Sequence, residues 1–269
     1  MKALFLTLIV LTSNLLASQY LIFGAISTVE PHLMELKLTP LMKEIEKVTG
    51  KKVKFKTGYD YTDTINKFAN GTFDIGYIGP IPYIKTQDIN PHALEILAGI
   101  KNSKKSPFRS VIISKKGSKF KKLEDLKNTS FAFGSPKSTL SYYVPKYMLV
   151  TSGTLKDIKE YHFLGRHDKV AQYVIMGKFA AGAIKQSIAN KYSKYLQIIA
   201  TSNAMPGFTI VANKKLDKKL TIKIKKLLLN LKNIDALKKI KKSAIGFEKR
   251  KDSDYDELRL IMREVDSYK

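Results

Sequence analysis

The sequence predicts an α/β protein with two lobes, the second of which is inserted into the first. Three observations predict this fold. Apolar strands alternate with amphipathic helices from about residue 20 to residue 100, a pattern typical of a mainly parallel sheet. A polar stretch, KNSKKSPF, then precedes a second alternation, and a bend at Pro206-Gly207 returns the chain. We therefore expect residues 19–102 and 207–269 in lobe 1, and residues 103–206 in lobe 2.

The first 18 residues have the pattern of a secretory signal peptide. Lys2 precedes an apolar run from Ala3 to Leu11, and small residues follow near a cleavage point after Ala17 or Ser18. The alternative is a membrane anchor, but the apolar run is too short to span a bilayer comfortably. We expect an exported, periplasmic protein with a cleaved leader.

The composition limits the possible functions. The chain of 269 residues has no cysteine, which excludes disulfides, thiolate metal sites and a cysteine nucleophile. Its net charge of +25 raises the possibility of nucleic-acid binding. However, the lysines are spread along the whole chain, and no aromatic–basic motif of the RNA-binding kind is present. We expect a solvated surface that attracts anions by long-range steering, and no nucleic-acid partner.

Lobe 1 offers hydroxyl groups near the ends of its predicted strands. The strand at residues 20–25 leads to Ser27 and Thr28, and Thr39-Pro40 predicts the start of a helix, with Thr39 as its N-cap. Asp60 predicts the start of another helix. Ligands of α/β sheets bind beyond the carboxyl ends of the strands. There the sequence places three tyrosines: Tyr61, Tyr77 and Tyr83.

The stretch FGSPKSTLSYYVP, at residues 133–145, predicts a strand, a small polar turn and a helix with Ser138 or Thr139 at its N-cap. Backbone N–H groups at the start of a helix lack intrahelical partners, and the helix dipole favours negative charge there. The stretch therefore has the features of an anion site. The simpler alternative is that the two hydroxyls only cap the helix.

Motifs of common enzymes are missing from the sequence. It has no GxSxG, HExxH or GxxxxGK[ST] pattern. Of the four histidines, only His162 and His167 are close in sequence, and their spacing is not a recognised zinc pattern. We expect neither catalysis, nor a metal, nor a cofactor.

Six segments, taken in order, form a recognisable set: FGAISTVEP, GYDYTDTINKFANGTFDIGYIGPIPYI, SPKSTLSYYVP, GRHDKVAQYVIMGKFAAGAI, MPGFTIVAN and IGFEKRKDSDYDELR. In these segments the chain resembles the exported substrate-binding proteins of phosphate/phosphite/phosphonate ABC transporters. The resemblance implies a type II periplasmic-binding-protein fold. It also implies that Ser138, Thr139 and helix N-terminal amides hold phosphonyl oxygens, and that Tyr61 and His167 contact the ligand. It leaves open whether Tyr77 or Tyr83 reaches the ligand.

Three positions depart from the family pattern. Members often carry a third hydroxyl after the Ser-Thr pair, where this chain has Leu140, with Ser141 one residue later. Members that bind aminoalkylphosphonates hold the amine with acidic residues, at positions that correspond to Ser187 and Phe208 here. Because a buried ammonium without a carboxylate partner is costly, we do not expect aminoethylphosphonate as the ligand.

We therefore expect a monomeric receptor that closes its lobes on phosphate, phosphite or a simple alkylphosphonate and delivers it to an inner-membrane ABC permease. Closure would occur at hinges near residues 101–108 and 201–209. Two alternatives remain at this point: an exported enzyme acting on phosphorylated compounds, and a sensor or adhesion module with a different small ligand. The expected ligand-binding residues are Ser138, Thr139, Tyr61, His167, Tyr77, Tyr83, Ser27 and Thr28.

Overall fold

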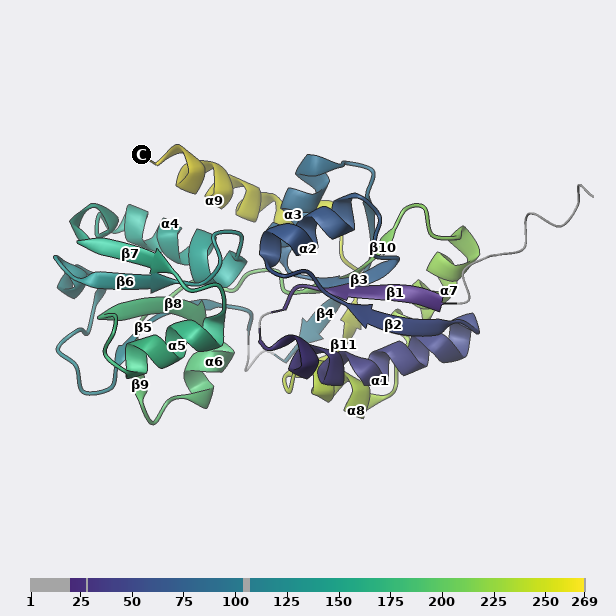
Figure 1. The fold of residues 1–269 in the computed structure, drawn as a ribbon, viewed down its shortest axis with the longest axis horizontal. Helices are drawn as coiled ribbons and strands as arrows, with labels where there is room; N and C mark the ends of the chain where they lie inside the picture. Colours follow the sequence, from purple (N-terminus) through teal and green to yellow (C-terminus); the bar gives the residue numbers. More distant parts are fainter. Residues whose placement is uncertain (1–19, 28, 104–106, 269) are drawn as a thin grey trace, which may run out of the picture.

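The computed structural model describes residues 20–27, 29–103 and 107–268. Two lobes, each built on one β-sheet, lie end to end, and the C-terminal helix runs along one side of both (Figure 1). The predicted signal peptide and Thr28 lie outside the described residues. Within the described residues, no helix is both long enough and apolar enough to cross a membrane.

Lobe 1 is built on a six-stranded mixed sheet. Strand β1 lies parallel to β2 and β3, whereas β10, which follows the second lobe in the chain, lies antiparallel to β3 and β4. The strands across the sheet are β11 (Ala244–Glu248), β4 (Leu94–Asn102), β10 (Thr209–Asn213), β3 (Ile75–Ile78), β1 (Tyr20–Ala25) and β2 (Lys52–Lys56).

Helices cover both faces of this sheet with apolar side chains. One face carries α1 (Pro31–Thr49), α7 (Lys218–Leu229) and α8 (Ile234–Ile240), and the other carries α2 (Tyr61–Ala69) and α3 (Pro80–Ile89). The prediction that Thr39 caps a helix at Pro40 is wrong. Helix α1 begins at Pro31, and the Thr39 hydroxyl donates within it to the Glu35 carbonyl at 2.8 Å. Pro31 occupies the first position of α1, which is the position that we predicted for Pro40.

Lobe 2 is built on a five-stranded sheet in the order β7 (Glu160–Phe163), β6 (Ser130–Phe133), β8 (Ala181–Lys185), β5 (Ser110–Lys115) and β9 (Leu196–Thr201). Helices α5 (His167–Ile175) and α6 (Gln186–Lys191) cover one face. The other face carries α4 (Val144–Thr151) and the short helices η1 (Leu123–Leu126) and η3 (Leu155–Asp157). A π-helical turn, η2 (Thr139–Tyr143), leads directly into α4.

Two chain crossings, from β4 to β5 and from β9 to β10, join the lobes. They lie side by side at Phe108 and Met205, where the Met205 amide donates to the Phe108 carbonyl at 2.8 Å. The C-terminal helix α9 (Asp256–Ser267) follows η4 (Asp252–Tyr255) and lies against α3 and α4 (Figure 1). The Lys146 ammonium donates to the Val265 carbonyl at 3.2 Å. The segment that we assigned to lobe 1 therefore also contacts lobe 2.

Candidate functional site

The first helical turns of two helices face each other across the interface between the lobes. On lobe 2, Ser138 caps η2, and its hydroxyl accepts from the Ser141 amide at 3.2 Å. On lobe 1, α3 begins after Gly79 without a side-chain cap from that lobe's described residues. The Thr139 hydroxyl of lobe 2 supplies the partner instead, accepting from the Ile81 amide at 3.0 Å. Both helix N-termini thus meet at the Ser-Thr pair.

A small pocket of about 10 Å³ lies at this meeting point. Tyr61, the first residue of α2, reaches it from lobe 1, and its hydroxyl shares a hydrogen bond with the Ser138 hydroxyl. Burial raises the pKa of Tyr61 to about 12, so the phenol keeps its proton at neutral pH. The small pocket is lined by Ile26, Tyr61, Gly79, Pro82, Phe108, Ser138, Thr139, Leu140, His167, Lys185 and Phe208.

His167 enters the small pocket from the start of α5. Gly165, with a φ of 80°, makes the left-handed turn that brings the chain from β7 into this helix. The His167 ring is buried, and its Nδ1 accepts from the Lys185 amide at 3.1 Å. Burial, with repulsion from the Lys185 ammonium, holds the pKa of His167 well below its ordinary value. The ring is therefore neutral with its proton on Nε2, which makes it a donor.

The structure brings Ser138, Thr139, Tyr61 and His167 together, but it separates the other predicted residues. Tyr77 lines a neighbouring larger cavity and stacks on Phe208, with the ring centroids 4.4 Å apart. The Tyr83 hydroxyl donates to Asp252 at 2.9 Å, and the side chain lines neither cavity. Ser27 also lies outside both and pairs with the Thr57 hydroxyl at 3.2 Å.

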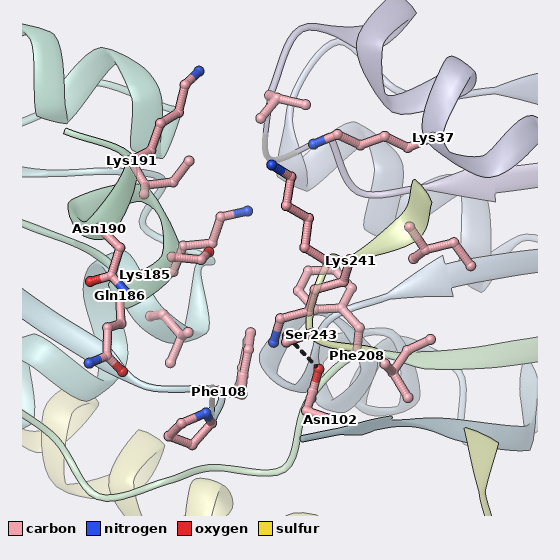
Figure 2. A pocket seen from close by; sticks show the side chains of 18 of the residues that line it. Lys37, Asn102, Phe108, Lys185, Gln186, Asn190, Lys191, Phe208, Lys241 and Ser243 are labelled. Atoms are coloured by element: carbon pink, nitrogen blue, oxygen red, sulfur yellow. Dashed lines mark hydrogen bonds between the residues drawn. The ribbon is translucent and has the colours of Figure 1, made fainter. Parts of the chain in front are cut away.

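The larger cavity, of about 850 Å³, lies between the lobes next to the small pocket (Figure 2). It shares Phe108, Leu140, Lys185 and Phe208 with the small pocket. Its other lining residues come mainly from α1, α6, α8 and the segment that follows α8. The two cavities form one continuous candidate site.

Lys185 is the functional candidate that the sequence reasoning missed. It ends β8, lines both cavities and is partly buried. Burial, with repulsion from Lys37 and Lys241, lowers the pKa of Lys185 to about 7. Its place at a strand's carboxyl end is the signal that could have identified it, but many other lysines surround it in the sequence.

The structure places the two histidines of the predicted pair in different surroundings. His162 is exposed and lies 3.6 Å from the Glu160 carboxylate, whereas His167 is buried in the small pocket. In the part of the chain that the structure describes, no group of three or more His, Cys, Asp or Glu side chains is arranged to hold a metal ion.

A family model for the periplasmic substrate-binding protein of phosphonate ABC transporters matches residues 23–255. The chain belongs to this family. The predicted family, the bilobal type II fold and the role as a solute receptor of an ABC importer are thereby confirmed.

Curated relatives support the same family. The phosphate-import protein PhnD of Mycolicibacterium smegmatis is 24% identical over 82% of this chain and 78% of that protein. The phosphonates-binding periplasmic protein of Escherichia coli is 27% identical over 77% of this chain and 65% of that protein.

Among solved structures, PhnD1 of Prochlorococcus marinus in complex with methylphosphonate superposes with a TM-score of 0.81 at 24% identity, covering 92% of this chain and 98% of that one. A binding-protein component of a phosphonate transporter from Pseudomonas aeruginosa gives a TM-score of 0.81 at 21% identity, over 92% of this chain and 86% of that one. These likenesses show the fold.

The three departures from the family pattern lie in or beside the candidate site. Leu140 is buried and lines both cavities, so an apolar surface stands where members often carry a third hydroxyl. Ser141 does not replace that hydroxyl, because its Oγ is buried, lacks a partner among the described residues and lines neither cavity. Ser187 and Phe208 both line the large cavity, and neither carries a negative charge.

Proposed function

We propose that this family member binds a small phosphorus oxyanion in the small pocket and delivers it to the membrane permease. The observation that carries the proposal is the meeting of two helix N-termini at Ser138 and Thr139. Amides at helix starts and hydroxyls are donors to anionic oxygens, and the two helix dipoles reinforce each other there.

Every other polar group in the small pocket suits an anion. The Tyr61 phenol keeps its proton, and neutral His167 offers the Nε2 proton. Lys185 contributes the positive charge, and no acidic side chain is among the described residues that line the small pocket. Hydrogen bonds to a charged group contribute about 1.5–3 kcal/mol each, so a few of them support tight binding.

The size of the small pocket implies that the lobes move. About 10 Å³ is close to the space that one water needs, which is less than a phosphonate group requires. The contact between the Thr139 hydroxyl and the Ile81 amide must therefore separate as the ligand enters. We propose that the lobes open at the two crossings and that ligand oxygens then take the place of this contact.

Methylphosphonate, phosphate and phosphite are the first ligands to test. PhnD1 of Prochlorococcus marinus, a probable phosphite-binding protein, was solved with methylphosphonate, and the relative from Mycolicibacterium smegmatis is a phosphate-import protein. We further propose that the leader is cleaved, that the receptor acts as a monomer without catalysis or nucleic-acid binding, and that its lobes divide near residues 102 and 207.

Calorimetric titration of the Thr139→Val variant tests this proposal. Valine keeps the branched shape but removes the hydroxyl, so methylphosphonate affinity should fall roughly 10- to 100-fold, since 1.4 kcal/mol corresponds to a factor of ten. Thr221→Val is the matched control, because Thr221 is also a buried helical threonine with a backbone hydrogen bond, its hydroxyl donating to the Asp217 carbonyl, and it lines neither cavity. Equal affinities of wild type and Thr139→Val would overturn the proposed site.

A further inference from the structure

The charged side chains that line the large cavity are all positive. Seven lysines and Arg109 line it, and none of its described lining residues is acidic. The Arg109 Nε is buried and has no hydrogen-bond partner among the described residues. Like charges gathered around one cavity repel one another and focus a positive field on that space, and a bound anion relieves the repulsion.

Three of the lysines point into the same space from different elements. Lys37 of α1 and Lys241, which directly follows α8, extend from lobe 1 toward Lys185 at the end of β8 in lobe 2 (Figure 2). Burial lowers the pKa of Lys241 to about 8, and burial with repulsion from Lys191 lowers the pKa of Lys37. Burial thus disfavours the charged form of these lysines, and repulsion from Lys37 and Lys241 adds to this at Lys185. A bound anion would favour the charged form.

The lysine cluster is next to the small pocket. Lys241 lies with its ammonium 5.7 Å from the centroid of the Phe108 ring, and Phe108 lines both cavities. Lys185 also lines both. The stacked rings of Tyr77 and Phe208 offer an apolar wall in the large cavity, and Phe208 also lines the small pocket. A molecule held in the small pocket by one end would pass this wall and reach the lysines with the other.

We propose that the physiological ligand is an organic phosphonate or phosphate ester that carries a second acidic group, and that Lys37, Lys185 and Lys241 bind this group in the large cavity. The inference rests on the proposed function, because the phosphorus end occupies the small pocket. It goes further by stating the charge of the other end. An uncharged tail would add no negative charge to the lysine cluster, and an ammonium tail would be repelled by it.

Three ligands with tails of similar size test the inference: propylphosphonate, 2-aminoethylphosphonate and 2-carboxyethylphosphonate. Calorimetry on the wild-type protein should show that 2-carboxyethylphosphonate binds at least roughly tenfold tighter than propylphosphonate, with 2-aminoethylphosphonate the weakest. In the Lys37→Gln/Lys241→Gln double variant, the affinity ratio of the carboxyethyl to the propyl ligand should fall toward one. Lys223→Gln is the matched control, because Lys223 is an exposed lysine of α7 that does not line the cavity.

The outcomes separate the two proposals. If propylphosphonate binds as tightly as the carboxyethyl ligand in the wild type, the inference is overturned while the proposed function stands. The same holds if the double variant keeps the wild-type ratio with an unchanged melting temperature. If none of the three ligands binds, nor methylphosphonate, the proposed function itself is overturned.

Discussion

The two adjoining cavities use opposite means to attract an anion. The small pocket relies mainly on short, neutral donors fixed by secondary structure: the Ser138 and Thr139 hydroxyls, the Tyr61 phenol and the His167 ring. The large cavity relies on long ammonium side chains from separate elements. Fixed donors recognise the shape of an oxyanion, whereas flexible charges recognise only its sign. The small pocket suits the phosphonate or phosphate group that all the candidate ligands share. The large cavity suits the tail, which differs from one ligand to another.

Size accounts for this difference. In the small pocket of about 10 Å³, an unpaired charge has no room for water, so neutral donors cost least. In the large cavity of about 850 Å³, water can solvate the ammonium groups until a ligand replaces it. Each cavity therefore uses the kind of donor that its hydration permits.

Replacing Lys185 should have the largest effect, because this lysine lines both cavities. We expect Lys185→Met to weaken both propylphosphonate and 2-carboxyethylphosphonate by roughly 30-fold or more, from a loss of about 2 kcal/mol or more for each charged hydrogen bond. Calorimetry measures this, with Lys223→Met as the control. Weakening of the carboxyethyl ligand alone would assign Lys185 to the large cavity only.

The pH dependence of binding should be the next largest effect. With a pKa of about 7, Lys185 loses its charge between pH 6 and pH 8, so the affinity advantage of wild type over Lys185→Met for propylphosphonate should shrink by roughly tenfold over this range. The groups that face Lys185 are Lys37, Lys241, Asp168 and His167. His167 contributes little to this change, because burial holds its pKa well below its ordinary value. Dividing the wild-type affinity by the Lys185→Met affinity at each pH cancels the effect of the ligand's own titration, because both proteins bind the same ligand. A ratio that stays constant from pH 6 to pH 8 would contradict the prediction.

The ion pair at the edge of the cleft should have the smallest effect. Glu30, which precedes α1, pairs with Arg166, which precedes α5, and thus links the two lobes. Both side chains are substantially exposed, so we expect Glu30→Gln to weaken methylphosphonate binding by at most about fivefold, less than about 1 kcal/mol. Glu95→Gln is the matched control, since its partner Lys225 belongs to the same lobe. An equal loss in both variants would exclude a role in closure.

The sequence could predict two helix caps beside the small pocket, because a cap is a local interaction. Ser138 caps the helix that follows it, and Asp60 caps α2 by accepting from the Asp63 amide, as the residue pattern indicated. The same local reasoning gave a wrong helix start where two prolines compete for the first position. Pro31 and Pro40 are both acceptable helix starts, and only the packing of the whole α1 against the sheet decides between them.

The large cavity could not be predicted, because its lysines are far apart in the sequence. Lys37, Lys185 and Lys241 belong to three elements that only the tertiary fold brings together. With 48 lysines and arginines in the chain, no composition signal distinguishes these three from solvated ones. Tyr83 shows the converse: its place near a strand end suggested a ligand contact, but the fold directs its hydroxyl to Asp252.

The most direct test of this account is one calorimetric comparison of propylphosphonate and 2-carboxyethylphosphonate on Thr139→Val and on Lys37→Gln/Lys241→Gln. The account predicts that Thr139→Val weakens both ligands by a similar factor, because both place the phosphonate in the small pocket. It predicts that the lysine variant weakens chiefly the carboxyethyl ligand. If the lysine variant weakened both ligands equally, the division of the site into a phosphonate-binding pocket and a charge-selecting cavity would be contradicted.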